Sequence, residues 1–341
     1  TGQFGVALRL PIDAIDSEWG LYGMRINSRT PFVSAYTGTW GPVITNPASP
    51  PQLRALRTLV NPVAAQEAAL AALGVRSAYG FWEYPDGINI FGTTLSTNIA
   101  GWSVGAELGY THNQPVQING NDILYSATAG VGPMAPRTRA ATAAGVGNEI
   151  HGYDRFRKTQ LQVNTVKILP SMLGATQGQF IAEIAGQWAS NTNDEAERQG
   201  IRYGRAFIFG LGSNGGLGAF DTRDTCNPAS PLWNPQRDGC QNDGYATSTA
   251  WGYRLKASLD YTGAFDTGFT LTPSVFWSHD VSGYSVDSQF IKDRMILGLG
   301  LRADYQKKYT IDLGYTAFLD KAKYDPFKDR DYLSLAFSAT F

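Results

Sequence analysis

Apolar residues recur at every second position along most of the chain. In the C-terminal segment Asp329–Phe341, small or polar residues alternate with apolar ones, which are Leu333, Leu335, Phe337, Ala339 and Phe341. A side-chain period of two predicts a β-strand with one apolar face and one polar face. The chain is therefore expected to consist mainly of such strands.

About eleven segments show this alternation, and most have the length of about ten residues that is typical of membrane-spanning strands. The long segment Ser77–Ile99 is either a single bent strand or two strands that break at Pro85–Gly87, since proline and glycine interrupt strand pairing. The segments are Gln3–Leu10, Glu18–Asn27, Ser77–Ile99, Gly101–Thr111, Phe156–Leu169, Gly178–Ala189, Thr247–Tyr261, Gly268–Val281, Lys292–Gln306, Lys308–Asp320 and Asp329–Phe341.

The residues on the two faces indicate a membrane barrel. Tyr and Trp stand at the ends of the apolar rows, whereas the other rows mix Gly, Ser and charges of both signs. This arrangement is typical of transmembrane β-barrels, which have an outer surface in lipid, aromatic girdles at both interfaces and a wet interior. The sequence thus predicts an all-β, antiparallel transmembrane β-barrel in the bacterial outer membrane, in contact with outer-membrane lipid and lipopolysaccharide.

The connections between these strands alternate between short and long, provided that Ser77–Ile99 is a single bent strand. The short ones are Pro11–Ser17, Ala100, Pro170–Gln177, Thr262–Thr267 and Lys307. The long ones are Ser28–Arg76, His112–Arg155, Ser190–Ala246, Ser282–Ile291 and Lys321–Lys328. Barrels of this kind place short turns in the periplasm and long loops outside the cell, so the long connections are expected to be extracellular.

Both ends of the chain bear on the size of the barrel. A last strand with a terminal aromatic residue is habitual in outer-membrane barrels, whose assembly machinery recognises that strand, so Phe341 is predicted to be the assembly signal. No signal peptide precedes Thr1, although an outer-membrane protein needs one. Bacterial single-chain barrels have an even number of strands, so about three more N-terminal strands are expected, about fourteen in total. The chain would then be the C-terminal portion of a longer protein and would pair with the missing N-terminal portion.

One segment has a helical composition. Residues Pro51–Leu73 are interrupted by Pro62 and contain Arg54, Arg57 and Glu67. This segment is too short and too charged for a membrane helix, so we expect a helical insertion in a long loop. The Ala- and Gly-rich tract Ala127–Gly147 is low in complexity and is expected to be mobile or draped in the interior.

Charged residues of both signs fall on the polar positions of the strands, and the signs alternate between neighbouring strands. Such groups can satisfy each other across antiparallel strands. Two alternatives are open: an ion-paired interior without a ligand, or a charged constriction or headgroup contact. Neither sign is in surplus, which disfavours a charge-selective channel. The predicted polar network consists of Arg9, Glu107, Glu183, Arg254, Lys256, Asp260, Asp280, Arg294, Arg302, Asp304 and Asp312.

The predicted long extracellular loop 190–246 contains both cysteines of the chain, Cys226 and Cys240. Two thiols close in sequence in an exported protein favour a disulfide, which would stabilise the fold by about 3 kcal/mol if unstrained. The same loop contains the apolar, Gly-rich segment Ala206–Phe220. It is either a lid or capture loop over the barrel mouth, or else Ile201–Leu211 is an extra hairpin arm of the barrel or loop, since glycine permits both. The candidate capture residues are Phe207, Phe209, Leu211, Leu217 and Phe220.

Enzymatic and metal chemistry have weak support in the sequence. His279 lies on the apolar phase near a strand end, where an outer-leaflet lipid hydrolase would need it, but no serine stands in phase with it on a flanking strand. The acidic residues Asp325, Asp329 and Asp331 alternate with Lys and Arg and lack EF-hand spacing. We therefore expect no enzyme, no metal and no cofactor. The formal net charge of -1 also argues against nucleic-acid binding.

Several ordered blocks resemble a large family of Gram-negative outer-membrane proteins that is catalogued only as a domain of unknown function. The resemblance touches most of the chain. The blocks that carry it are GVALRLPI and WGLYGMRINSRTP within Gly5–Pro31, the run Gly92–Leu124, WSHDVSGYS at Trp277–Ser285, and Asp329–Asp331. Family members are longer and are often encoded beside RND-type transporters and a companion periplasmic protein. The resemblance implies passage of a lipid-like molecule across the outer membrane, similar in plan to the long-chain fatty-acid transporters.

Two function classes follow. The first is an outer-membrane conduit for a hydrophobic or lipid-like small molecule, coupled or not to a periplasmic transport partner. The second is a structural barrel component of a trans-envelope complex without a substrate path of its own. A lipid hydrolase is a remote third. An apolar cavity that continues from Ala206–Phe220 would favour the first, and a fully plugged interior would favour the second.

Overall fold

Eleven antiparallel strands form one large sheet. The computed structural model describes residues 2–38, 78–129, 132–144, 147–190, 200–213, 222–229, 233–236, 239–319 and 321–340. Within these residues the strand order is β1-β2-β5-β6-β8-β9-β10-β11-β12-β13-β14. The bounds are β1 Phe4–Ile12, β2 Ser17–Ile26, β5 Ile88–Ile99, β6 Trp102–Gln117, β8 Tyr153–Leu169, β9 Gln177–Ala189, β10 Thr249–Thr262, β11 Phe269–Ser282, β12 Met295–Tyr305, β13 Tyr309–Leu319 and β14 Tyr332–Ala339.

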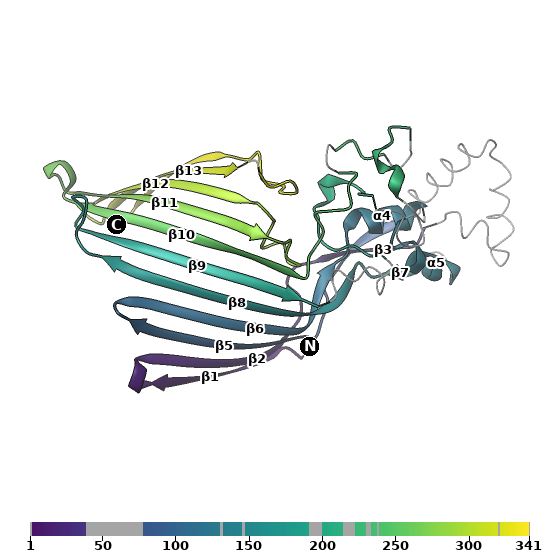
Figure 1. Cartoon of the computed structure of the whole chain (residues 1–341), viewed down its shortest axis with the longest axis horizontal. Helices are drawn as coiled ribbons and strands as arrows, with labels where there is room; N and C mark the ends of the chain where they lie inside the picture. The colour runs from purple at the N-terminus through teal and green to yellow at the C-terminus, as the bar shows by residue number, and fades with distance from the viewer. Residues whose placement is uncertain are drawn as a thin grey trace.

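The sheet is curved but not closed (Figure 1). Among the described strands, β1 pairs only with β2 and β14 pairs only with β13. The antiparallel β architecture expected from the alternation is confirmed. Closure into a barrel is not seen in the described part of the chain.

Short turns lie at one end of the sheet, and long connections lie at the other (Figure 1). The tightest turn joins β5 to β6 through Ala100 and Gly101, whose φ angles are 51° and 74°. Two successive positive φ angles belong to the type I′ hairpin turn, whose twist matches that of the strands. The chain enters β1 at the long-connection end and leaves β14 at the short-turn end (Figure 1).

A second, three-stranded sheet lies at the long-connection end, in the order β4-β3-β7. Its strands are β3 Phe32–Tyr36, β4 Tyr79–Glu83 and β7 Glu149–Ile150. The single bent strand predicted for Ser77–Ile99 is therefore wrong, and the break alternative holds. Pro85 lacks a backbone donor and Gly87 has a φ of 63°, which separate β4 from β5 in the chain and let the two strands join different sheets. The connections of the large sheet still alternate between short and long, because β4 belongs to the small sheet and is part of the long connection between β2 and β5.

Two helices cover this end, α4 (Gly120–Ala129) and α5 (Ala135–Ala143). The side chain of Asn119 caps α4 by accepting the backbone N–H groups of Asn121 and Asp122 at 3.1 and 3.3 Å. The tract Ala127–Gly147, predicted to be mobile or draped in the interior, instead contains α5 in its described part. Its Ala-rich composition favours helix, and Met134, Thr138 and Thr142 form a buried stripe at helical spacing.

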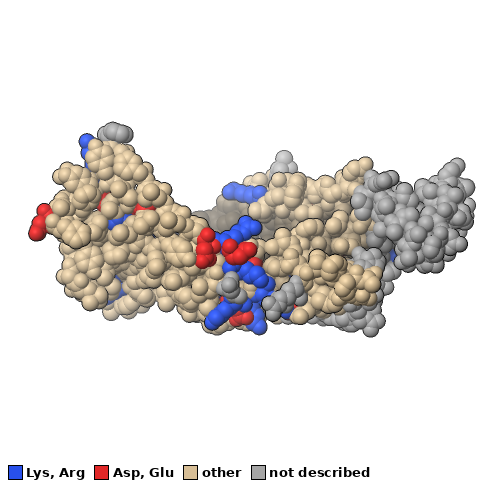
Figure 2. Space-filling model, turned by 90° about the horizontal axis from the view of Figure 1, so that it is seen from above, with Lys and Arg blue, Asp and Glu red and all other residues tan. Residues whose placement is uncertain are grey.

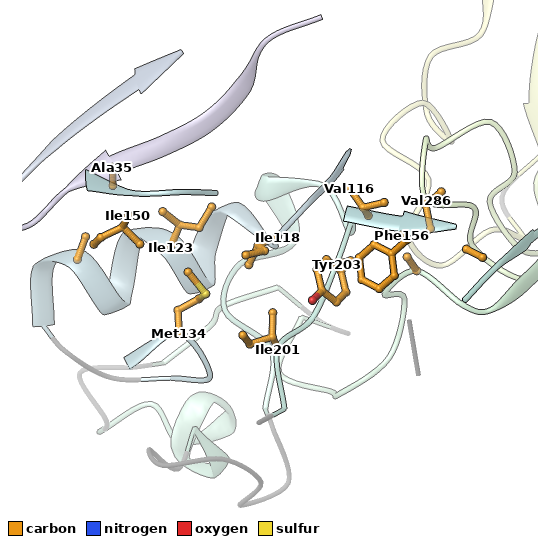
Figure 3. Packing of buried hydrophobic residues seen from close by; sticks show 13 residues of the cluster. Ala35, Val116, Ile118, Ile123, Met134, Ile150, Phe156, Ile201, Tyr203 and Val286 are labelled. Carbon is orange, nitrogen blue, oxygen red and sulfur yellow. The ribbon is translucent and has the colours of Figure 1, made fainter. Parts of the chain in front are cut away.

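The hydrophobic core lies at the long-connection end, among these elements and the adjoining ends of β6, β8 and β9. Ile123 on α4 points toward Ile150 on β7, and Tyr203 packs on Phe156 with ring centroids 4.9 Å apart (Figure 3). Met134 lies in the same cluster. None of the helices among the described residues is long and apolar enough to cross a membrane. The predicted helical insertion Pro51–Leu73 falls outside the described residues.

Candidate functional site

One face of the large sheet, here the apolar face, is hydrophobic across all eleven strands. Residues directly opposite each other in an antiparallel pair lie on the same face, so the register can be followed from strand to strand. One such row consists of Val275, Leu299, Tyr315 and Leu333. On β14 the apolar side chains are widely exposed, and Leu335 keeps 74% of its surface accessible. Soluble monomers rarely expose so extended an apolar surface.

Aromatic residues border the apolar face at both ends. Tyr261, Phe269, Tyr305 and Tyr309 lie at the short-turn end, and the rings of Phe269 and Tyr305 are 4.8 Å apart. Trp188 and Trp251 lie toward the long connections. The 11 residues of β12 extend for about 36 Å. A tilt of about 45° reduces this to about 25 Å, the height of the apolar band of an outer-membrane barrel.

Charges are rare over the sheet in the view of Figure 2 and gather in a band where the sheet meets the long connections. Lys167 is an exception in sequence, because it falls on the apolar face. Its ammonium group, however, donates to the carbonyl of Ala100 in the turn at 2.9 Å and lies 5.5 Å from the ring of Trp102. A lysine that reaches the edge of an apolar surface in this way keeps its charge at the boundary.

The opposite face, here the polar face, contains every residue of the predicted polar network that lies in a strand. Asp280 on β11 is fully buried, and its carboxylate accepts hydrogen bonds from Arg294 Nε at 2.8 Å and from the Ile291 N–H at 3.0 Å. Arg254 on β10 lies 3.7 Å from both Asp280 and Glu183. These groups form one chain of alternating charges across three strands and the residue that precedes β12.

The remaining network residues are distributed more loosely over this face. Arg302 pairs with Asp312 across β12 and β13 at 3.5 Å, and Asp260 and Asp304 accept hydrogen bonds from threonines at 2.8 and 3.1 Å. Glu107, Lys256 and Arg9 stand apart from this cluster. Arg9 approaches Glu18 at 4.0 Å, and neither Glu107 nor Lys256 has an ion-pair partner within the part of the chain that the structure describes. Much of the predicted network is thus ion-paired.

The connection between β11 and β12, here the polar-face loop (residues 283–294), folds back over the polar face. Phe290 is buried against Ala185 and Ala250, and Arg254 lies 5.6 Å from its ring. At the tip, Asp287 accepts a hydrogen bond from Lys158 on β8 at 2.8 Å. The sequence placed this connection outside the cell and did not predict its return onto the sheet.

The Asp287 carboxylate anchors the tip of this loop. Gln187 on β9 also donates to it, at 2.9 Å. Burial by itself would raise the pKa of Asp287, but the Lys158 ammonium and the hydrogen bonds from Lys158, Ser285 and Gln187 outweigh burial and lower that pKa. Asp287 is therefore charged at neutral pH and tied to two neighbouring strands.

A cavity of about 800 Å³ lies at the long-connection end, above the polar-face loop. Its walls come from β3 and β4, from α4, from the segment around residues 204–207 and from the polar-face loop. The lining is mostly apolar, with Val33, Ile123, Leu124, Phe207 and Val286 among its side chains. Its size lies within the range of pockets that bind small molecules, about 300–1,000 Å³.

The predicted capture loop contributes to this cavity through one aromatic residue. Phe207 lines the cavity and is 58% exposed. Phe209 and Leu211 are instead buried, and the ring of Phe209 lies 5.2 Å from that of Tyr324 in the connection between β13 and β14. Leu217 and Phe220 fall outside the described residues. Residues Ile201–Leu211 do not form the predicted alternative, a hairpin arm, since they contain only an isolated bridge at Tyr203 and a 3₁₀ turn at Phe207–Phe209.

Arg205 holds this segment in place. Its guanidinium donates to the carbonyl oxygens of Gln241 and Phe209 at 2.7 and 3.0 Å and lies between the rings of Tyr245 and Tyr324, at 4.9 and 4.7 Å. Such cation–π contacts favour a desolvated cation. Sequence patterns did not single out Arg205. The available signal was a pair of arginines, at positions 202 and 205, beside an apolar segment.

The disulfide predicted between Cys226 and Cys240 is present, with Cα atoms 5.1 Å apart. The carbonyl oxygen of Cys240 accepts hydrogen bonds from the Ser213 N–H at 2.7 Å and from the Thr225 hydroxyl at 3.2 Å. The bridge therefore joins the parts of the long loop that surround the capture segment. The predicted assembly residue, Phe341, lies outside the described residues.

His279 lies on the apolar face, with its ring 5.6 Å from that of Tyr253. Among the described residues, no hydroxyl group forms a hydrogen bond with it. The arrangement offers an aromatic contact near the end of β11 and, among these residues, no hydroxyl partner for the imidazole.

Comparison with known proteins gives a family without an assigned activity. The family model described as "Protein of unknown function (DUF1302)" matches residues 1–341. No curated protein matches the chain.

Proposed function

Since the chain belongs to this family of unknown function, we propose from its structure that it is an outer-membrane conduit for a hydrophobic or lipid-like small molecule. The observation that carries the proposal is the cavity at the long-connection end, with its apolar walls and a volume of about 800 Å³. Apolar pockets with a few polar groups are the usual form of small-molecule sites.

The apolar face supports a position in the bacterial outer membrane. Lipid is the medium that suits this face best, because the face extends over all eleven strands of the large sheet, aromatic residues border both ends and charges gather at one boundary (Figure 2). An unpaired strand edge cannot face lipid, since its backbone groups would lack hydrogen-bond partners. In our proposal the edges of β1 and β14 are therefore joined by further strands of the same barrel.

The polar-face loop defines the route of the ligand. Ser285, Val286 and Phe290 line the cavity, and the same loop touches Lys158 and Gln187 on the polar face. A molecule that leaves the cavity toward the interior has to pass this loop. The long-connection end would be the extracellular side, because outer-membrane barrels place long loops there, and a periplasmic transport partner would receive the molecule at the short-turn end.

A structural barrel component of a trans-envelope complex is the second candidate. The ion-paired part of the polar face and the return of the polar-face loop favour it, because both fill the interior. A lipid hydrolase has less support, since no hydroxyl group among the described residues bonds to His279.

Substitutions in the cavity wall distinguish the two candidates. Phe207→Asp places a charge in the apolar wall, and we expect it to weaken binding of the neutral fluorescent probe N-phenyl-1-naphthylamine to the full chain by about tenfold, because each 1.4 kcal/mol changes a binding constant tenfold. Ile208→Asp is the matched control, since Ile208 is similarly exposed (55%) but does not line the cavity.

Fluorescence titration of the detergent-solubilised protein, with empty micelles subtracted, gives the affinities. A conduit requires loss of binding in Phe207→Asp and retention in Ile208→Asp. Equal affinities for all three proteins, or equal losses in both variants, would exclude the cavity as a binding site and leave the structural role.

A further inference from the structure

The cavity wall contains a buried cation without a matching carboxylate. Arg205 lines the cavity and keeps only 8% of its surface accessible. No carboxylate of the described residues lies within ion-pair distance of its guanidinium. Its NH groups bond to neutral carbonyl oxygens and to the Tyr245 hydroxyl, and its Nε–H has no acceptor in the described part of the chain. A buried charge that lacks an opposite charge is costly to a protein.

Three nearby carboxylates do not supply the counter-charge of Arg205, because each pairs with another cation. These pairs are Arg202 with Asp122, Asp287 with Lys158, and Asp243 with Lys323. Arg205 is therefore a cavity-lining cation without an ion-pair partner among the described residues. In surroundings of low dielectric constant, such a charge attracts an anion more strongly than it would in water.

A second donor lies on the same side of the cavity. Tyr284 of the polar-face loop lines the cavity, and its ring is 6.3 Å from that of Tyr324, which itself stacks on Arg205. Its hydroxyl group forms no hydrogen bond with the described residues. Burial raises the pKa of Tyr284 to about 12, so at neutral pH this hydroxyl keeps its proton and can donate it to an anion.

The rest of the lining is suited to an apolar body. Val33 on β3, Ile123 and Leu124 on α4, and Phe207 face the cavity from other elements. An alkyl chain against these side chains would gain about 0.8 kcal/mol for each CH₂ group that it buries.

We propose that the cavity selects amphiphiles with a single negatively charged group, whose charge is compensated by Arg205 and whose oxygen accepts the Tyr284 hydroxyl. This inference rests on the proposed function and adds the chemical class of the ligand to it. The apolar part of the ligand lies against Val33, Ile123 and Phe207.

Three probes with the same twelve-carbon chain test the proposal: dodecanoate, dodecan-1-ol and dodecylammonium. Equilibrium binding of each to the full chain in a neutral maltoside detergent is measured at pH 8, below the probe's micelle concentration. We expect dodecanoate to bind about tenfold more tightly than the alcohol, and dodecylammonium to bind more weakly than the alcohol, because a buried hydrogen-bonded charge contributes roughly one factor of ten.

Two variants locate the selectivity. Tyr284→Phe keeps the ring and removes the donor, and it should reduce the preference for dodecanoate over dodecan-1-ol by about threefold, as one hydrogen bond does. Arg205→Gln should abolish the preference. Arg205 also holds the capture segment, so the affinity for dodecan-1-ol reports whether its cavity is intact. If Arg205→Gln no longer binds dodecan-1-ol, its cavity is not intact, and the proposal is then judged from Tyr284→Phe and from the three probes on the wild-type protein.

The outcomes separate this inference from the proposed function. If dodecan-1-ol binds as tightly as dodecanoate to the wild-type protein, the inference is wrong and the conduit proposal stands. The same holds if the preference persists in Tyr284→Phe and in an Arg205→Gln protein that still binds the alcohol. If none of the three probes binds, the proposed function fails and the inference falls with it.

Discussion

Two buried arginines, three positions apart in sequence, have different partners for their charges. Arg202 forms a two-point ion pair with Asp122, with Nε 2.9 Å from Oδ2, and lies 4.7 Å from the ring of Tyr245. Arg205, whose guanidinium lies 4.9 Å from the same ring, has carbonyl groups, a hydroxyl group and aromatic rings as its partners among the described residues. Burial raises the pKa of Tyr245 to about 12, so the ring that both cations contact stays neutral at physiological pH. The difference between the two arginines is the basis for assigning an anion to Arg205.

Asp287 gives a prediction at the same scale. Its pKa is lowered in the folded protein, so its stabilising contribution is complete above the unfolded value of about 3.9 and is lost as the pH falls through the folded value. Asp287→Asn should lower the free energy of unfolding by about 1–3 kcal/mol at pH 7 through loss of the charged bonds to Lys158 and Gln187. Denaturant unfolding is measured from about pH 7 to about pH 2, on either side of the unfolded value of about 3.9. The difference in free energy of unfolding between wild type and Asp287→Asn should disappear at the acid end.

The neighbouring substitution Ser288→Asn serves as a control, because Ser288 is exposed and its side chain forms no hydrogen bond with the described residues. A difference between wild type and Asp287→Asn that stayed constant at low pH would contradict the role of the charged carboxylate in holding the polar-face loop.

At the scale of single elements, the strands of the large sheet follow from local alternation, whereas the small sheet at the long-connection end does not. Nine of the eleven strands of the large sheet lie within three residues of their predicted bounds, because alternation over five or more positions is a local property of the chain. The exceptions are β5, which begins at Ile88 and not at Ser77, and β6, which continues past Thr111 to Gln117. The assignment of Arg254, Asp280 and Glu183 to one face followed from the same parity. By contrast, β3, β4 and β7 are short, and their pairing joins segments far apart in sequence.

The turn between β5 and β6 in the large sheet gives a prediction at this scale. Ala100 adopts a φ of 51°, which is unfavourable for a residue with a Cβ atom, and Asn-Gly is the preferred pair in this turn type. Ala100→Asn should raise the free energy of unfolding by about 0.5–1 kcal/mol. Gly101→Ala should lower it by about 1 kcal/mol, because φ is 74° and a Cβ atom would lie 2.8 Å from Lys167 Nζ.

Equilibrium unfolding of both variants measures the change in the free energy of unfolding, which should be positive for Ala100→Asn and negative for Gly101→Ala. Changes of the same sign would show that the turn does not determine the stability of this hairpin.

At the scale of the whole molecule, the two faces of the sheet determine which solvent each side meets. The apolar face carries exposed leucine, isoleucine and phenylalanine across all strands, whereas the polar face is crossed by ion pairs and covered at one end by the polar-face loop. In water the apolar face would be an aggregation surface. In lipid it would be the surface that inserts the protein, and the long connections would project beyond the bilayer together with the cavity.

Charged substitutions on the two faces test this arrangement. Leu335 lies near the middle of β14 on the apolar face, opposite Leu313. Leu335→Arg should cost about 2–4 kcal/mol of folding free energy in a lipid bilayer, as arginine does at the midplane of a barrel. Ser334→Arg, on the polar face of the same strand, should cost much less. Folding of the full chain into liposomes, followed by urea titration, measures both.

If Leu335→Arg were as well tolerated as Ser334→Arg, the apolar face would not contact lipid. The membrane position proposed for this protein would then be wrong, whatever the cavity binds.

The order of residues along the chain was enough to determine the strands, the face on which each side chain lies, the alternation of short and long connections and the pairing of Cys226 with Cys240. Each of these depends on neighbours in sequence or, for the cysteines, on the absence of any other partner. Only the tertiary structure decided that the polar-face loop returns to Lys158 and that Arg205 is enclosed by Tyr245 and Tyr324 beside an apolar cavity. These contacts join segments that are distant along the chain, and their energies depend on burial and on exact partner geometry, which no local period encodes.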